Sequence, residues 1–385
     1  MRVRTTTKGE VTVMKRSSRL CVGKVVMFLA ICPVALAILT SPAAWAADGQ
    51  ADYVLISRDG DTTYVRSGKT KETVFKSPHA KEAIEWAMNN SGITVVGEGT
   101  YTLAGSIEVP RSNVSLVITE KAELVAAPDA RLTIITEGHG NYASLIYNAG
   151  HDHVSIVNFG TLDAGGPCVI MVEGRNGGKC GIDGGLVFSS GLLRTRKDAV
   201  WIVDAKNVTV PLIWCDGPAN TLAIEGCEDL AIDTVAELAT VGRDTGRHGN
   251  EAIDLNSYSR RVHVKLAIGT PPLEEVIDIN NSPDCVFDEV RSYGKARLVS
   301  RTVYPPTGKR LTQKPHISHS DGAVVKKETI VDKKLQSWKT QVDVRGLPEA
   351  LPRITVVAKL TAVFKDGSEE EVLNKTYHLH LNEPQ

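Results

Sequence analysis

A six-residue sequence returns almost unchanged one period later in this chain. EAIDLN at residues 251–256 is followed by EVIDIN at residues 275–280, 24 residues further on. A fixed period of about 20–50 residues is typical of stacked repeats, in which equivalent side chains lie above one another. The predicted stacked pairs are Glu251 with Glu275, Asp254 with Asp278 and Asn256 with Asn280.

Weaker repeats of the same kind extend from about residue 93 to residue 300. Each unit has two alternating apolar stretches separated by a short polar turn, as at Asn113, Asp152 and Asn207. A unit of this kind buries its apolar side chains only by stacking on its neighbours, which argues for a parallel β-helix. Helical repeats are the alternative, but no unit shows helical periodicity.

The N-terminus has the pattern of a secretory signal. Basic residues between Lys15 and Lys24 precede an apolar run at 25–40 and an Ala-Trp-Ala motif at 44–46. We expect cleavage after Ala46 and a secreted or periplasmic protein. The apolar run is shorter than the roughly 20 residues of a spanning helix, so we expect no stable membrane span after cleavage.

Changes of pattern divide the chain into five parts. They are a signal peptide (1–46), an N-terminal hairpin with a capping helix (47–92), the parallel β-helix (93–300), a linker (301–322) and a C-terminal β module (323–385). In the second part, Ser77 is the predicted helix cap, and Ala83, Ile84 and Ala87 form an apolar stripe.

The C-terminal module has about four alternating stretches and a hairpin at Asp366-Gly367. They predict either a small β-sandwich-like module or a cap over the open end of the repeats. The net charge of −1 gives no basic field for nucleic acid.

Two of the seven cysteines, Cys21 and Cys32, lie in the signal, which leaves five. The five are Cys168, Cys180, Cys215, Cys227 and Cys285. The first two are 12 residues apart, and so are the next two. Short disulfides are one expectation in an oxidising compartment, and buried apolar thiols are the other.

The opening of the repeat region resembles the pectate-lyase-like superfamily. The similarity runs from the helix at 81–90 through GITVVGEGTYTL (92–103) to IEVPRSNVSLVI (107–118). This resemblance implies an all-β fold, a single-stranded right-handed parallel β-helix with an N-terminal capping helix. It also implies activity, in many members, on uronic-acid polysaccharides.

Within that superfamily, NEAIDLNS (250–257) and EEVIDINNS (274–282) resemble the acidic coils of polygalacturonase-type hydrolases. The resemblance places the acid and the base at Asp254 and Asp278. The Gly-His-Gly of those hydrolases follows the acidic coils, whereas here it precedes them, at 138–140. Elimination, epimerisation and hydrolysis therefore all stay open, because one fold hosts many reactions.

Alternation along each strand places Asp254 and Asp278 on one outward face, about 4.8 Å apart. Two carboxylates that close cannot both ionise freely, so one pKa rises or a cation binds between them. A raised pKa provides a general acid. The expected cation is Ca²⁺, with Asp254, Asp278 and Glu225 as its ligands.

The sequence thus predicts an exported enzyme, a polysaccharide lyase, epimerase or glycoside hydrolase, that acts on an acidic polysaccharide. The catalytic candidates are Asp254, Asp278, Arg247, His248 and Lys295. The substrate-binding candidates are Glu225, Asn256, Asn280, Arg243 and Tyr293.

The alternative is a non-catalytic extracellular or envelope solenoid that binds polysaccharide or a cell surface. Under that interpretation Asn256 and Asn280 form a stabilising amide ladder. Glu251 and Glu275 are expected to be solvated at the corners of the coils.

Overall fold

The computed structural model describes residues 52–135, 142–174, 181–215, 220–238, 251–256, 259–270, 273, 275–294, 296–302, 322–348 and 351–381. The expected signal peptide and most of the expected linker lie outside these ranges. So do Arg243, Arg247, His248, Lys295 and Cys180. Within the described ranges, no helix has the length and apolar character needed to cross a bilayer.

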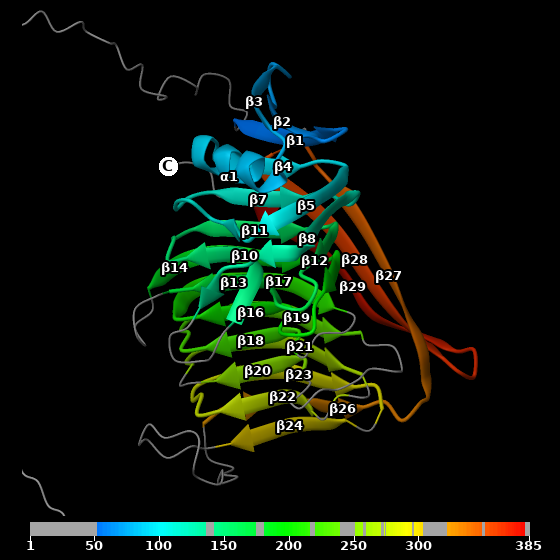
Figure 1. The fold of residues 1–385 in the computed structure, drawn as a ribbon. Coiled ribbons are helices and arrows are strands. Elements are labelled where there is room, and N and C mark those ends of the chain that lie inside the picture. The colour runs from blue at the N-terminus through cyan, green and yellow to red at the C-terminus, as the bar shows by residue number, and fades with distance from the viewer. Residues whose placement is uncertain are drawn as a thin grey trace, which may run out of the picture. The chain divides into compact units, whose positions relative to one another are not determined.

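The fold is all-β and is built mainly from parallel sheets (Figure 1). The largest, here called the large sheet, has 13 strands. In spatial order it runs β25 (Val324–Val325), β23 (Val286–Ser292), β21 (His263–Gly269), β19 (Ala231–Glu237), β17 (Ala205–Cys215), β14 (Ile182–Ser189), β11 (Val154–Asn158), β7 (Ser115–Ile118), β4 (Ile93–Val96), β1 (Tyr53–Asp59), β2 (Thr62–Ser67) and β3 (Thr73–Ser77), with β26 (Glu328–Ile330) also on β23.

Two further parallel sheets complete the repeat region. The second sheet runs β24 (Arg297–Thr302), β22 (Glu275–Asn280), β20 (Ile253–Asn256), β18 (Leu222–Glu225), β16 (Val200–Val203), β13 (Cys168–Glu173), β10 (Tyr142–Ala149) and β6 (Ile107–Glu108), with β9 (Ile134–Ile135) on β10. The third sheet runs β15 (Leu192–Arg194), β12 (Thr161–Asp163), β8 (Ala122–Arg131) and β5 (Gly99–Gly105).

The chain passes from sheet to sheet, so neighbours in one sheet come from successive passes. Strands β10, β11 and β12 enter the second, large and third sheets in turn, and β13, β14 and β15 repeat that order. From β16 to β25 the described strands alternate between the second and the large sheet. Each pass therefore stacks on the one before it, as the repeat predicted.

Left-handed backbone at the start of several large-sheet strands turns the chain between the sheets. Asn113, Asn207 and Asp229 have φ values of 59°, 56° and 56° there. Asn and Asp tolerate this region better than other side chains. The turns also bond to one another, because the Asn113 amide donates to the Asp152 carbonyl oxygen over 3.0 Å. This explains the polar residues that recur between the apolar stretches of the sequence.

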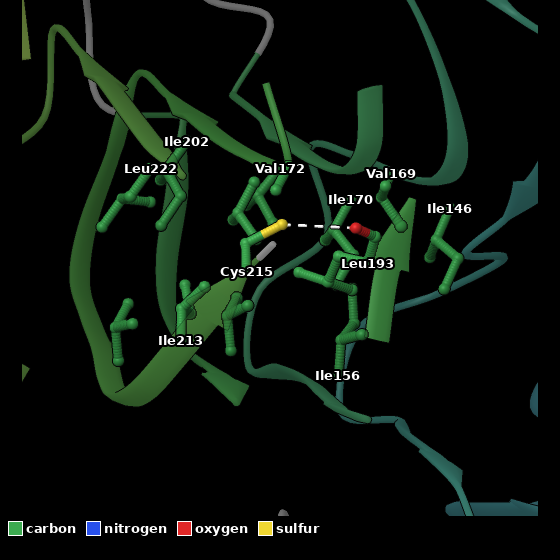
Figure 2. Close-up of a cluster of buried hydrophobic side chains, with 14 of the residues drawn as sticks. Ile146, Ile156, Val169, Ile170, Val172, Leu193, Ile202, Ile213, Cys215 and Leu222 are labelled. Atoms are coloured by element: carbon green, nitrogen blue, oxygen red, sulfur yellow. Dashed lines mark hydrogen bonds between the residues drawn. The ribbon is translucent and has the colours of Figure 1, made fainter. Parts of the chain in front are cut away.

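Apolar side chains from the three sheets meet in one core. Figure 2 shows Ile146 and Ile170 of the second sheet, Ile156 of the large sheet and Leu193 of the third sheet converging. The Cys215 thiol lies in the same core and donates to the Leu193 carbonyl oxygen over 3.3 Å (Figure 2).

The described cysteines, namely Cys168, Cys215, Cys227 and Cys285, are all buried, and none of them is in a disulfide. The disulfide considered between Cys215 and Cys227 is therefore not formed. These two thiols donate instead to backbone carbonyl oxygens, that of Cys227 to the Ile202 oxygen over 3.4 Å. They behave as small core side chains, which is the second of the two expectations.

Helix α1 (Ala80–Asn90) is the one helix of the described residues. Its buried face contains Ala83, Ile84 and Ala87, as predicted from the apolar stripe. The N-cap is His79 rather than Ser77. Ser77 lies two residues before His79, and its hydroxyl accepts from the His79 backbone amide over 3.0 Å and donates to Glu82 over 2.8 Å.

The segment after residue 322 does not form one four-stranded module. Its two short strands, β25 and β26, extend the large sheet. The other three, β27 (Leu335–Arg345), β28 (Arg353–Phe364) and β29 (Glu369–His380), form a separate antiparallel sheet, here called the C-terminal sheet. The expected sandwich-like module is thus replaced by one sheet that uses the large sheet as its second layer.

The two layers share one apolar interface. The inner face of β28, including Val356 and Leu360, packs in one cluster with Leu212 and Ile268 of the large sheet. At its margin the Lys375 ammonium contacts the Asp233 carboxylate over 2.5 Å. Burial of the predicted apolar face of β28 therefore decides where the C-terminal sheet lies.

We expect Leu360→Ala to destabilise the protein by about 2–5 kcal/mol, because it leaves a cavity at a fully buried position. Val357→Ala, on the opposite and half-exposed face of β28, is the matched control and should cost under about 1 kcal/mol. Urea unfolding followed by circular dichroism measures both. Equal effects would contradict the inward assignment of Leu360.

Candidate functional site

The strands of the second sheet stack in register and arrange their outward side chains in columns. One of them, here called the central column, pairs Trp201 with Ala223, Ala223 with Asp254, Asp254 with Asp278, and Asp278 with Ser300. The stacking of Asp254 on Asp278 that the sequence predicted is therefore confirmed.

Alternation fixes which way these carboxylates face. Ile253 and Leu255, on either side of Asp254 in β20, are fully buried in the core. Side chains at successive positions of a strand point to opposite faces. Asp254 therefore lies on the face turned away from the core, and the same reasoning applies to Asp278 between Ile277 and Ile279.

The other end of the central column is apolar. Tyr147, Met171 and Trp201 precede Ala223 and form a small cluster of their own with Cys168. Trp201 is 5 % exposed. The outward face therefore changes from aromatic and apolar to acidic within two strands.

A column of polar groups lies beside the central column, on the side nearer the start of each strand, and is here called the first column. It contains Asp198, Asn220, Glu251, Glu275 and Arg297. The Asn220 amide nitrogen donates to Asp198 over 2.8 Å, and the Glu251 backbone amide donates to the Asn220 oxygen over 3.3 Å. Glu275 is in register with Arg297.

Glu251 departs from its expected place at a solvated corner. Only 5 % of its surface is exposed. Burial raises the pKa of Glu251 to about 9, and the nearby carboxylates of Asp254, Asp278 and Glu275 raise it further. Glu251 is thus part of the acidic group, a role that the sequence reasoning missed although the residue begins the repeated hexapeptide.

Three other acids of the face, Asp254, Asp278 and Asp198, also have raised pKa values. Burial, followed by the charges of Asp278 and Asp198, raises the pKa of Asp254 well above its usual value. Burial raises the pKa of Asp278, against hydrogen bonds from Asn280 and Ser300 that lower it. Burial raises the pKa of Asp198 to about 6.

A third column places Val203, Glu225 and Asn256 in register. The Asn280 amide nitrogen donates to the Asn256 oxygen over 2.6 Å and to Asp278 Oδ2 over 2.8 Å. The amide ladder predicted from the repeat is therefore present. It also holds Asp278 in place.

Three acceptor oxygens of this group have no hydrogen-bond partner. They are Oδ1 of Asp254, Oδ1 of Asp278 and Oδ1 of Asn280, and each of these atoms is buried. A buried acceptor without a donor costs about 1–3 kcal/mol. The group is therefore incomplete unless a proton or a ligand supplies donors.

Tyr293, predicted to bind substrate, does not join the acids. It is buried after β23, where its hydroxyl donates to Glu370 of the C-terminal sheet over 3.1 Å and its ring contacts Trp338. Its function here is packing of the C-terminal sheet.

The predicted cationic partners, Arg243, Arg247, His248 and Lys295, lie outside the described residues. Arg297 is described, and its charge lowers the pKa of Asp278. Among the described side chains, no three His, Cys, Asp or Glu are grouped closely enough to hold a metal ion. Calcium at Asp254, Asp278 and Glu225 stays a prediction.

Comparisons with known proteins add no family. No family model matches the chain, and no curated protein matches it. Among solved structures, ORF18 of Geobacillus virus E2 is 9 % identical, covers 84 % of each chain and has a TM-score of 0.23. A likeness this low supports no argument about fold or function.

The raised pKa of Glu251 makes stability depend on pH. The folded state binds a proton that the unfolded state has lost between about pH 4.5 and pH 9, so stability should fall as pH rises through that window. We expect Glu251→Gln to lose less stability as pH rises and to be more stable than the wild-type protein at alkaline pH. Thermal melts across the window measure this. A variant that keeps the wild-type pH slope would contradict the assignment.

Proposed function

We propose that the chain is an exported right-handed parallel β-helix protein that cleaves a polysaccharide at Asp254 and Asp278. The sheet-to-sheet path of β10–β15, the one helix before the repeats and the resemblance in 81–118 support the fold. The signal pattern at 1–46 supports export.

The observation that carries the proposed chemistry is the stacking of Asp254 on Asp278 among acids with raised pKa values. Carboxyls on adjacent strands about 4.8 Å apart lie near the roughly 5–5.5 Å of retaining glycosidases. Burial and mutual repulsion keep one carboxyl of such a pair protonated near neutral pH. That carboxyl is a proton donor for the leaving glycosidic oxygen.

In the proposed reaction the protonated carboxyl donates to the glycosidic oxygen while its ionised neighbour attacks the anomeric carbon. Water then releases the sugar from the ester, assisted by the first residue acting as a base. Asn280 holds Asp278 through the 2.8 Å hydrogen bond and so orients it. Elimination or epimerisation would instead use the ionised carboxylate as the base that removes a proton from the sugar.

An acidic polysaccharide is the substrate class expected from the sequence. Its carboxylates would face the acids of the central and first columns, so a cation would have to bind between them. Ca²⁺ suits the carboxylate and amide oxygens of Asp254, Asp278, Glu225 and Asn280 in chemical type. Such a substrate would therefore require added Ca²⁺ for binding.

A non-catalytic polysaccharide-binding protein is the second candidate. The hydrogen bond from Asn280 to Asn256 favours it, because an amide ladder stabilises stacked strands without any reaction. Under that function, replacing an acid in the column removes repulsion and leaves binding intact.

We expect Asp254→Asn and Asp278→Asn each to lower the cleavage rate by about 10²–10⁴-fold, the usual contribution of a positioned acid or base. Asp129→Asn, an exposed residue of the third sheet, is the charge-matched control. New reducing ends report hydrolysis and near-ultraviolet absorbance reports elimination, on pectin, alginate and glycosaminoglycan with and without Ca²⁺. If the wild-type protein releases no product from these or from neutral and amino-sugar polymers, the enzymatic proposal fails.

A further inference from the structure

The three unpartnered oxygens of Asp254, Asp278 and Asn280 form an acceptor set whose orientation is fixed by the network. Asn280 is 6 % exposed, and its nitrogen donates both to Asn256 Oδ1 and to Asp278 Oδ2. Turning the amide over would place its oxygen against two other acceptors. The unpaired atom of Asn280 is therefore its oxygen, beside the acids.

Most of the charges around this set are negative, although the charge of Arg297 also acts on Asp278 and lowers its pKa. The groups whose charge acts most on Asp254 are Asp278, Asp198 and Glu225. Those that act most on Glu251 are Asp254, Asp278 and Glu275. A ligand that brings further carboxylates meets repulsion here, whereas one that brings positively charged donors gains charge-assisted hydrogen bonds.

We propose that this outward face at β20 and β22 binds the protonated amino group of an amino-sugar polymer. An ammonium group has three N–H donors and no acceptor. The unpartnered acceptors here are likewise three. That the amino group belongs to a sugar rests on the proposed carbohydrate function.

An ammonium fits this set better than a divalent cation does. An ammonium group is satisfied by three acceptors, whereas Ca²⁺ takes six to eight oxygen ligands. The apolar cluster of Tyr147, Met171 and Trp201 adjoins the acids along the same column.

Isothermal titration calorimetry on the full chain near neutral pH tests the proposal. The probes are a glucosamine hexamer, the matching N-acetylglucosamine hexamer, a galacturonate hexamer, spermine and CaCl₂ alone. We expect the glucosamine hexamer to bind at least about tenfold more tightly than the other organic probes. Asp278→Asn should weaken that binding about tenfold, and Asp129→Asn should leave it unchanged.

Ser300→Lys gives a second variant that does not depend on removing an acid. Ser300 is in register with Asp278 and partly exposed, so a lysine there supplies an internal ammonium to the same acceptors. Ser300→Lys should keep the thermal stability of the wild-type protein but no longer bind the glucosamine hexamer. Ser300→Gln should still bind the hexamer. Retained binding by a folded Ser300→Lys protein overturns the site.

The other outcomes are equally decisive. Equal binding of both hexamers, tightest binding of spermine, selective binding of galacturonate, or a response to CaCl₂ alone overturns the amino-sugar assignment. Absence of binding by every probe overturns it as well. Selective glucosamine binding without cleavage defeats the hydrolase proposal and leaves this inference standing, so the two failures are distinguishable.

Discussion

The in-register stacking of the second-sheet strands is the constraint on which the rest of the structure depends. Because Ile253 and Leu255 lie above Ile277 and Ile279 in the core, their outward neighbours must also stack. Burial of these aliphatic side chains, at about 25 cal/mol per Å² of apolar surface, outweighs the repulsion between Asp254 and Asp278. The acid pair is therefore held by its neighbours and not by its own interactions.

Holding these acids together changes their chemistry. Carboxyls that share a poorly solvated face bind protons that isolated ones would release. The amide ladder adds order, since Asn280 orients Asp278 while leaving its own oxygen without a donor. The same face thus provides a proton donor for bond cleavage and an acceptor set for a positively charged group. Both properties follow from stacking one short acidic sequence on its copy.

Much of this arrangement was predictable from periodicity. The 24-residue repeat gave the pairing of Asp254 with Asp278, and alternation gave the inner face of β28. Glu251 was misplaced because burial at a corner depends on neighbouring passes that local pattern does not contain. Tyr293 was misassigned because proximity in sequence to the acids said nothing about the C-terminal sheet packed on the other side. Four candidate partners, from Arg243 to Lys295, stay predictions.

The central claim is that stacking keeps carboxyls of this face protonated near neutral pH. Carbon-13 NMR of side-chain carboxyl groups, titrated in the wild-type protein and in Glu251→Gln and Asp254→Asn, measures this directly. We expect some carboxyl resonances to keep the chemical shift of the protonated form near pH 7, although the usual pKa of a carboxyl group is about 4. These resonances should be missing in the matching variants. Ionisation of every carboxyl below about pH 5 would contradict it.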